Sequence, residues 1–281
     1  MANEKMREYW NGEFVESWVR AQAAYNAMLE PFNDAILGAG PVRAGDRVVD
    51  VGCGSGALAR AAGVVVGAAG SVTGLDISEP MLGLARDLSA GFAQVRFVCC
   101  DAQSEDLSDI AADVVVSRFG VMFFEDPVAA FANLAAATAN GGRLAFACWR
   151  PALENEWITV PLRAVVAVVG APDLPAPGAP GPFQMGDADF VRETLSAAGW
   201  DGVELSRFDT RMCPGGARDV DGAVRFLTED AVGRALLADK PDDVRARAVA
   251  AVREALAPHW TEDHGVLLGA AAWIVTARLP S

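Results

Sequence analysis

The sequence predicts an α/β fold, with helices on both sides of a doubly wound, mostly parallel seven-stranded sheet that has one antiparallel edge strand. Short apolar strand patterns alternate with helical patterns through the first half of the chain. One of these strands runs into a turn with three glycines at alternate positions, and a helical pattern follows at once. The last two strand patterns have no helix packed between them in the parallel manner, so we expect one of them to be antiparallel at the edge.

Residues 1–40 form a predicted helical cover. Their apolar residues recur at spacings of three and four, which is typical of one face of a helix. These residues are Trp10, Phe14, Trp18, Ala21, Tyr25, Met28, Leu29 and Phe32. We expect Pro31 to mark a break between two helices, because proline removes a backbone donor inside a helix.

Residues 41–150 form the predicted core domain, in which strands separated by helices favour right-handed crossovers and a parallel sheet. The predicted strands are Val48–Val51, Val72–Asp76, Val95–Cys100, Asp113–Ser117 and Arg143–Trp149. A first helix is expected over residues 56–67, and a second begins after its N-cap Ser78. A third helix is expected over Pro127–Ala139, where Gly141 and Gly142 end it.

The rest of the chain is predicted to form a lid and to complete the sheet. The lid insertion, residues 151–198, contains a helix over 154–170, a proline-rich connector over 171–182 and a helix over Asp187–Ala198. Residues 199–281 complete the sheet. Their predicted elements are a strand over Val203–Thr210, helices over 219–257 and a strand over Val266–Ala277.

Composition narrows the class of protein. The 281 residues are 52% hydrophobic and 21% charged, which suits one large domain or one domain with a lid. The net charge of −14 argues against binding to nucleic acid or to anionic membranes. We expect no membrane span and no signal peptide, because no apolar stretch is long enough. The five cysteines are odd in number and form no Cys-x-x-Cys pair, which favours a reduced, cytoplasmic protein.

The turn after the first strand is a candidate ligand site. Its glycines, Gly52, Gly54 and Gly56, allow bare backbone N–H groups to approach a ligand. Asp50 lies inside the strand end, where an unpaired carboxylate is costly. We therefore expect Asp50 either to hold the turn by hydrogen bonds or to meet a cationic group of the ligand.

Two more acids follow neighbouring strands. Asp76 stands where an acid binds ribose hydroxyls in nucleotide sites, and capping a helix is its alternative role. Asp101 can accept a hydrogen bond from an exocyclic amine such as that of adenine, while the Ala102 N–H serves a ring nitrogen; the alternative is a loop cap. The glycine spacing also fits a dinucleotide site, but such sites usually have an apolar residue at the position of Asp50.

These stretches together resemble the successive motifs of class I S-adenosylmethionine-dependent methyltransferases. The matching segments are residues 49–56, 74–78, 100–102, 113–119 and 141–144. The resemblance runs from about residue 20 to residue 150 and is greatest to the small-molecule branch that includes ubiquinone/menaquinone C-methyltransferases. It implies a Rossmann-like fold, S-adenosyl-L-methionine as cofactor and S-adenosyl-L-homocysteine as its product.

The resemblance also implies a set of cofactor-binding residues. These are Asp50, Gly52, Cys53, Gly54, Gly56, Asp76, Ile77, Met81, Asp101, Ala102, Ser117 and Arg118. Asp50 and the glycines would hold the methionine part, and Asp76 the ribose. Ile77 and Met81 would lie against the adenine, whose edge Asp101 and Ala102 would read. Ser117 and Arg118 would face the sulfonium and the substrate entrance.

Aromatic residues suggest a pocket for a flat, partly apolar acceptor with an anionic or carbonyl group. Candidates are Trp18, Tyr25, Phe119, Met122, Phe123, Trp149 and Trp157, with Arg150 as a further wall; ordinary helix and lid packing is the alternative. His259 or His264 could reach the mouth as a base, although a solvated loop is the simpler interpretation. Their spacing matches no standard metal site, and no catalytic residue is assigned.

The sequence thus predicts S-adenosylmethionine-dependent methyl transfer to a small organic acceptor, with O- or C-methylation favoured. Two alternatives stay open: a nicotinamide-dependent oxidoreductase, and a non-catalytic S-adenosylmethionine-binding protein. Nucleic-acid partners are disfavoured, since Ser117-Arg118-Phe119-Gly120 stands where exocyclic-amine methylation needs an Asn/Asp-Pro-Pro-aromatic signature. A homodimer is compatible with the sequence.

Overall fold

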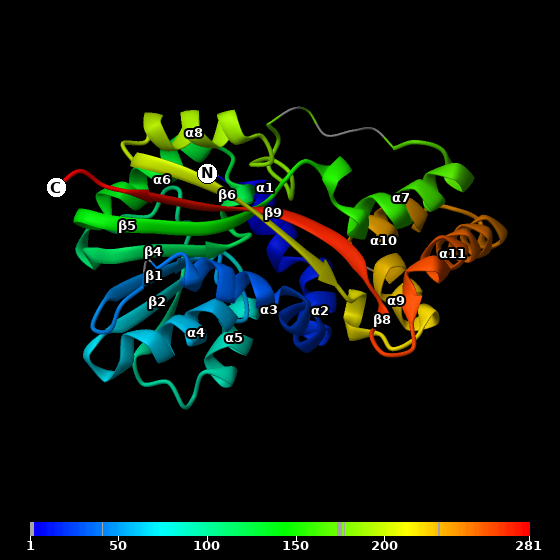
Figure 1. The fold of residues 1–281 in the computed structure, drawn as a ribbon, viewed down its shortest axis with the longest axis horizontal. Coiled ribbons are helices and arrows are strands. Elements are labelled where there is room, and N and C mark those ends of the chain that lie inside the picture. The colour runs from blue at the N-terminus through cyan, green and yellow to red at the C-terminus, as the bar shows by residue number, and fades with distance from the viewer. Residues whose placement is uncertain (1–2, 41, 173–175, 177, 230) are drawn as a thin grey trace.

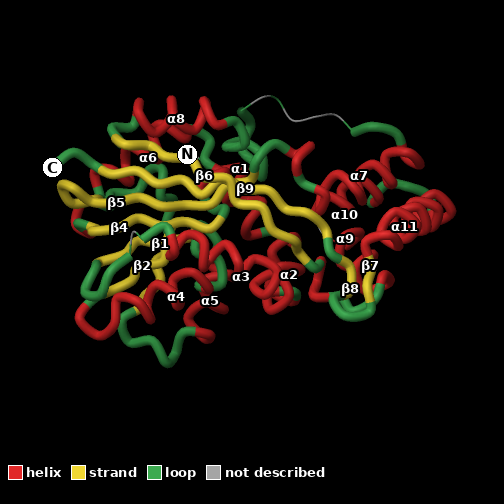
Figure 2. Tube along the Cα trace, viewed as in Figure 1, coloured by secondary structure: helices red, strands yellow, loops and turns green. Residues whose placement is uncertain are grey.

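The computed structural model describes residues 3–40, 42–172, 176, 178–229 and 231–281. A twisted sheet forms the centre of this molecule, helices lie on both of its sides, and a further group of helices stands at one end (Figure 1). Figure 2 shows the strands continuing from the sheet toward this group, in which helices predominate. No described helix is both long enough and apolar enough to cross a membrane.

The sheet has seven strands in the order β3-β2-β1-β4-β5-β9-β6. They are β1 Arg47–Val51, β2 Ser71–Asp76, β3 Val95–Cys99, β4 Ala112–Arg118, β5 Thr138–Trp149, β6 Asp201–Met212 and β9 Leu268–Arg278. The first five strands in this order are parallel, and β9 is antiparallel to both β5 and β6. A seven-stranded, mostly parallel sheet with one antiparallel strand is therefore confirmed.

The antiparallel strand lies one position inside the edge, and β6 is the edge strand instead. The burial patterns give the physical reason. Most residues of β9 are buried, as expected for a strand covered on both faces, whereas most residues of β6 are exposed or half-buried. The strand with two apolar faces takes the covered position, and the more polar strand takes the edge.

Helices flank the sheet on both sides. They are α4 Ala57–Val66, α5 Glu79–Leu88, α6 Pro127–Ala136 and α8 Ala188–Ala197. Figure 1 shows α6 and α8 together on one side and α4 and α5 on the other. Ser78 caps α5 as predicted, because its hydroxyl accepts a hydrogen bond from the Met81 N–H at 3.4 Å.

The N-terminal cover consists of three helices, α1 Glu4–Asn11, α2 Glu13–Arg20 and α3 Gln22–Gly38. The break predicted at Pro31 is wrong, because Pro31 lies inside α3. The half of α3 that follows Pro31 is anchored by two fully buried side chains, Phe32 and Ile36, and this burial offsets the lost backbone hydrogen bond. The chain breaks instead at Gly12 and Ala21.

The end predicted for the third core helix is also wrong. Helix α6 stops at Ala136, and β5 begins at Thr138, before Gly141 and Gly142. The Thr138 hydroxyl donates to the Leu134 carbonyl at 2.7 Å, which satisfies one of the open carbonyls at the helix end. The two glycines therefore lie in the irregular beginning of β5.

The helices at one end of the molecule, here called the helical cap, are α7 Glu156–Val169, α9 Val220–Glu229, α10 Ala231–Leu237 and α11 Asp242–Leu256. A small hairpin of β7 Trp260–Thr261 and β8 Gly265–Val266 adjoins them. The helical cap has an apolar core of its own, which includes Val165, Val224 and Leu256. A larger core packs around the sheet.

Candidate functional site

A cavity of about 260 Å³ opens at the carboxyl ends of the parallel strands. Strand ends of β1, β2, β3 and β4 form one part of its lining, and the N-terminal cover and the segment after β5 form another. This is where open parallel α/β sheets bind ligands. Ten of the twelve predicted cofactor residues line it: Asp50, Gly52, Cys53, Gly54, Asp76, Ile77, Met81, Asp101, Ala102 and Arg118.

The glycine turn, Gly52–Gly56, approaches the loop after β4 very closely. Gly52 has a φ of +63°, and a Cβ there would lie 2.6 Å from the Gly120 Cα. No other residue type fits this position without moving the backbone. The turn therefore brings main-chain groups to the cavity surface, where a side chain would block them.

Asp50 is a buried acid whose surroundings compensate its burial only in part. Its side chain is 1% exposed, and neither carboxylate oxygen has a hydrogen-bond partner among the described residues. Burial raises its pKa to about 7, and the Arg118 guanidinium and the nearby Ala59 amide counteract this only in part. The sequence allowed two roles for Asp50. It does not hold the turn by hydrogen bonds, and contact with a cationic ligand group stays a prediction.

Arg118 at the end of β4 is the cationic counterpart of Asp50. One of its nitrogens, Nη2, donates to the Asn26 Oδ1 at 3.0 Å, while Nη1 is buried without a partner. Burial lowers the pKa of this guanidinium to about 10, and Asp50 opposes that shift. The cavity therefore holds an unpartnered acid and an unpartnered basic N–H near each other.

Asp76 bridges the glycine turn and the start of α5. Its carboxylate accepts hydrogen bonds from the Gly54 N–H at 2.7 Å and from the Ser78 N–H at 2.9 Å. Burial raises the pKa of Asp76, and these two hydrogen bonds oppose the shift. The side chain lines the cavity while it holds the turn in place.

Asp101 accepts hydrogen bonds from its own loop and from Asn3 near the N-terminus. Its Oδ1 accepts hydrogen bonds from the Asn3 side-chain amide at 2.8 Å and from the Gln103 N–H at 3.0 Å, and its Oδ2 accepts from the Ser104 hydroxyl at 3.0 Å. The predicted role as a loop cap is therefore present. Asn3 also exchanges two hydrogen bonds with Glu125, so one N-terminal residue joins the loops after β3 and β4.

Two of the predicted cofactor residues do not line the cavity. The Ser117 hydroxyl is fully buried, donates to the Val51 carbonyl at 2.7 Å and accepts from the Gly120 N–H at 3.1 Å. It therefore joins β1 to the loop after β4. Gly56 has a φ of +77°, and a Cβ there would lie 2.7 Å from the Phe97 ring, so it serves the packing of the turn against β3.

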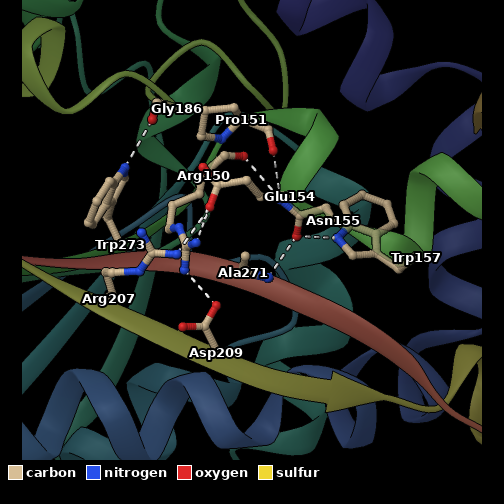
Figure 3. A network of polar contacts seen from close by, with 10 residues as sticks. All are labelled: Arg150, Pro151, Glu154, Asn155, Trp157, Gly186, Arg207, Asp209, Ala271 and Trp273. Atoms are coloured by element: carbon tan, nitrogen blue, oxygen red, sulfur yellow. Dashed lines mark hydrogen bonds and ion pairs between the residues drawn. The ribbon is translucent and has the colours of Figure 1, made fainter.

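All seven predicted acceptor-pocket residues line the cavity: Trp18, Tyr25, Phe119, Met122, Phe123, Trp149 and Trp157. The rings of Trp18 and Tyr25 stack with centroids 3.8 Å apart, and those of Phe119 and Trp149 stack at 3.9 Å. Arg150, expected as a further wall, does not line the cavity. It is buried beside Glu154 and Asp209 (Figure 3).

Several lining residues were not predicted. They are Asn3, Gln22, Asn26, Pro182 and Met212, among others. Asn26 donates to the Ser55 hydroxyl at 3.1 Å and so links α3 to the glycine turn. The helical pattern of residues 8–38 could have placed Gln22 and Asn26 one turn apart on a single face. No local pattern marks Asn3, Pro182 or Met212, which reach the cavity through the tertiary fold.

Neither histidine lines the cavity. His259 precedes β7, and His264 lies in the turn of the hairpin beside the helical cap (Figure 2). The possibility that one of them reaches the mouth is therefore not supported, because the hairpin pairs with itself rather than with the main sheet. His264 is exposed in a turn, as in the simpler interpretation. Across the described parts of the chain, no group of three His, Cys, Asp or Glu residues could hold a metal ion.

The middle of the chain matches a known family. Residues 49–146 match the family described as "Methyltransferase domain". Two curated proteins are similar to this chain: aklanonic acid methyltransferase DauC of Streptomyces sp. (strain C5), 36% identical over 104 residues, and demethylmenaquinone methyltransferase of Staphylococcus aureus (strain JH9), 34% identical over 101 residues. Each match covers 36% of this chain, and 47% and 42% of the respective relatives.

A solved structure has the same fold over nearly the whole chain. The Bacillus subtilis protein YcgJ superposes with a TM-score of 0.59 at 15% identity, and the match covers 90% of this chain and 99% of that one. The chain spans less than half the length of the curated relatives it matches. The likeness in sequence is thus concentrated in the domain that carries the glycine turn, while the likeness in fold extends to the remaining strands.

Proposed function

We propose that this chain, whose residues 49–146 are a methyltransferase domain, is an S-adenosylmethionine-dependent enzyme that transfers a methyl group to a small organic acceptor. The names of the curated relatives, which are methyltransferases of an organic acid and of a quinone, support this reaction class. O- or C-methylation is the favoured outcome. The cavity at the strand ends would hold both cofactor and acceptor.

One observation carries the proposal: the unpartnered Asp50 carboxylate and the unpartnered Arg118 Nη1 share one cavity with a bare glycine turn. Buried charges without partners are costly unless a ligand completes them. The methionine part of S-adenosylmethionine has an ammonium and a carboxylate and can satisfy both groups. In this arrangement Asp50 meets the ammonium, and Arg118 meets the carboxylate.

The adenosine part is assigned to the two other acids. Asp76 keeps acceptor capacity beyond its two backbone hydrogen bonds and would bind the ribose hydroxyls. Ile77 and Met81 provide apolar contact beside it. Asp101 would accept from the adenine amine, and the Ala102 N–H would donate to a ring nitrogen. Gly56 and Ser117 would not contact the cofactor; they hold the glycine turn and the loop after β4 in place.

In this proposal the protein contributes to the reaction by positioning the acceptor and by excluding water from the cavity. The bound cofactor supplies an electrophilic methyl group on a sulfonium. The rings of Phe119, Trp149 and Trp157 would hold the acceptor in line with that methyl group and keep water out. A proton acceptor is required only where the acceptor atom must lose a proton, and we assign no such residue.

The two alternatives make different predictions. A nicotinamide-dependent oxidoreductase would place a pyrophosphate at the glycine turn, next to the buried Asp50, and like charge opposes this. A non-catalytic protein would bind S-adenosylmethionine without transferring its methyl group. Neither alternative is favoured by a specific contact in the cavity.

The proposal is tested by calorimetric titration with S-adenosylmethionine, S-adenosylhomocysteine and NAD. We expect the first two to bind and NAD not to bind. Gly52→Ala should abolish binding, since its Cβ would strike Gly120. Gly67→Ala is the matched control: its φ is also positive, at +65°, but nothing lies within 4 Å of the added carbon. Binding of NAD alone would refute the proposal, and cofactor binding without turnover of any acceptor would favour the non-catalytic alternative.

We also propose a cytoplasmic location. All five cysteines are free, as in proteins of reducing compartments. A homodimer stays a prediction, which light scattering of the purified protein can test.

A further inference from the structure

Asn155 lies at the N-cap position of α7 but does not cap the helix. Asparagine at this position normally accepts a hydrogen bond from a backbone N–H of the first turn. Here no side-chain cap bond forms, although Asn155 is fully buried. Its side chain therefore serves another purpose than the start of its own helix.

The Asn155 side chain makes four hydrogen bonds, and they join three parts of the fold (Figure 3). Its oxygen accepts from the Ala271 N–H in β9 at 2.8 Å and from the Trp157 indole Nε1 at 3.0 Å. Its nitrogen donates to the carbonyls of Arg150 at 3.1 Å and Pro151 at 3.3 Å. One buried amide thus connects the sheet, the segment after β5 and the Trp157 ring.

The segment that carries Asn155 is itself anchored. The buried Arg150 guanidinium pairs with Asp209 of β6 at 2.6 Å and with Glu154, and its carbon lies 5.5 Å from the centre of the Trp273 ring. These contacts hold the segment on the outer part of the sheet and do not touch Trp157 (Figure 3). They therefore provide a neighbouring cluster for comparison, in which Arg150 is buried and its two acid partners are partly exposed.

Trp157 is the ring that Asn155 orients, and it faces the cavity. Its centroid lies 5.1 Å from that of Trp149, and Trp149 in turn stacks on Phe119 at 3.9 Å with an interplanar angle of 13°. Phe119 and Trp149 therefore stack on each other, Trp157 is tilted by 47° against Trp149, and all three rings line the cavity. A planar ring system offers the matching surface for stacking.

We propose that Asn155 is a positioning residue that holds Trp157 as a wall of the acceptor site and thereby sets affinity for a planar polycyclic acceptor. This inference rests on the proposed function, because it assigns the ring-lined end of the cavity to the acceptor. Asn155 does not line the cavity and acts only through Trp157.

The test measures binding of alizarin, a planar three-ring probe, to the protein saturated with S-adenosylhomocysteine, with catechol as a one-ring comparison. Asn155→Ala and Trp157→Phe each remove the hydrogen bond that orients the ring. Each should weaken alizarin binding by about 3- to 10-fold, which is the range for one neutral hydrogen bond.

Two controls distinguish an effect on the position of Trp157 from a general loss of structural stability. Asp209→Asn changes the Arg150 cluster without touching Trp157, so alizarin affinity should stay unchanged. The affinity for S-adenosylhomocysteine should be the same in all variants. In a Trp157→Phe background, Asn155→Ala should cause no further loss of alizarin affinity, because Asn155 acts on the acceptor site only through its hydrogen bond to the Trp157 indole.

Several outcomes would overturn the inference. These are full alizarin affinity in Asn155→Ala, additive losses in the double variant, or wild-type binding of alizarin no stronger than that of catechol. If Asn155→Ala does not fold, Trp157→Phe decides alone, and full affinity there is equally contrary. Failure of the wild type to bind S-adenosylhomocysteine would instead refute the proposed function, and the two failures are thereby distinguished.

Discussion

Asp50 shows a conflict between folding and binding within a single side chain. Its carboxylate is almost fully buried without a hydrogen-bond partner, and burial raises its pKa from 3.8 to about 7. The charged form is therefore unfavourable in the folded protein when the cavity holds no ligand. The same charge is what we expect an ammonium group to require.

We predict that Asp50→Asn stabilises the ligand-free protein at pH 8. As the pH rises from about 4 to 7, the unfolded state loses the Asp50 proton before the folded state does, so the free energy of unfolding of the wild type falls. At about 1.4 kcal/mol for each pKa unit, the loss over this whole range is about 4–5 kcal/mol. Urea unfolding at pH 5 and pH 8 should show the part of this loss that lies above pH 5, about 3 kcal/mol, in the wild type and not in the variant.

Ligand affinity should change in the opposite direction. In the wild type, S-adenosylhomocysteine should bind more tightly as the pH rises toward 7, because Asp50 becomes charged. In Asp50→Asn, binding should be weak and this part of the pH dependence absent. A variant that is less stable at pH 8, or that binds as tightly as the wild type, would contradict this account of Asp50.

Helix α1 shows how an element with little buried surface is held in place. None of its residues is fully buried, yet Met6 and Trp10 line the cavity. Asn3, just before the helix, bonds to Asp101 and Glu125, and Asn11 at its end donates to the Ile77 carbonyl at 3.0 Å and accepts from the Glu79 N–H at 3.2 Å. Hydrogen bonds from these two asparagines therefore hold α1 against the loops after β2 and β3.

We predict that these two asparagines limit local opening of α1. In hydrogen-exchange mass spectrometry, the amides of α1 should exchange sooner than those of α6. Asn3→Ala and Asn11→Ala should each accelerate α1 by about 3- to 10-fold, because each variant removes hydrogen bonds of modest strength. Exchange in α6 serves as the internal control. Equal rates of α1 exchange in wild type and both variants would show that other contacts hold the helix.

At the scale of the whole molecule, two apolar cores lie side by side. One packs around the sheet, and the other fills the helical cap between α7, α9, α10 and α11. The cavity borders the sheet core, and Trp157 at the start of α7 packs against both cores. A substitution that destabilises the helical cap core should therefore have little effect on cofactor binding.

We predict that the two cores differ in their coupling to the ligand. Leu256→Ala in α11 and Leu134→Ala in α6 each remove a fully buried leucine and should each cost about 2–5 kcal/mol of stability. In urea unfolding, S-adenosylhomocysteine should offset the loss in Leu134→Ala but not the loss of the helical cap in Leu256→Ala. A single transition that responds to the ligand equally in both variants would mean that the two cores unfold as one.

The core domain could be predicted because its signals are local in sequence. Buried parallel strands appear as continuous apolar runs, and the glycine turn and the acids Asp50, Asp76 and Asp101 lie within a few residues of strand ends. Strand ends of a parallel sheet meet at one edge, so neighbouring motifs imply a shared site. The aromatic lining was predictable for the same reason where it lies at the end of a strand, as for Phe119 and Trp149.

By itself, the sequence determined the order of strands and helices in the core domain, the glycine turn and the acids beside it, because each depends on a short stretch of chain. Only the tertiary structure decided that β9 inserts between β5 and β6, that Asn3 reaches Asp101, and that Asn155 orients Trp157 from a helix start. The physical reason is that these contacts involve buried polar groups whose partners stand far apart along the chain. Such partners are chosen by packing and by hydrogen-bond satisfaction, and no local pattern encodes them.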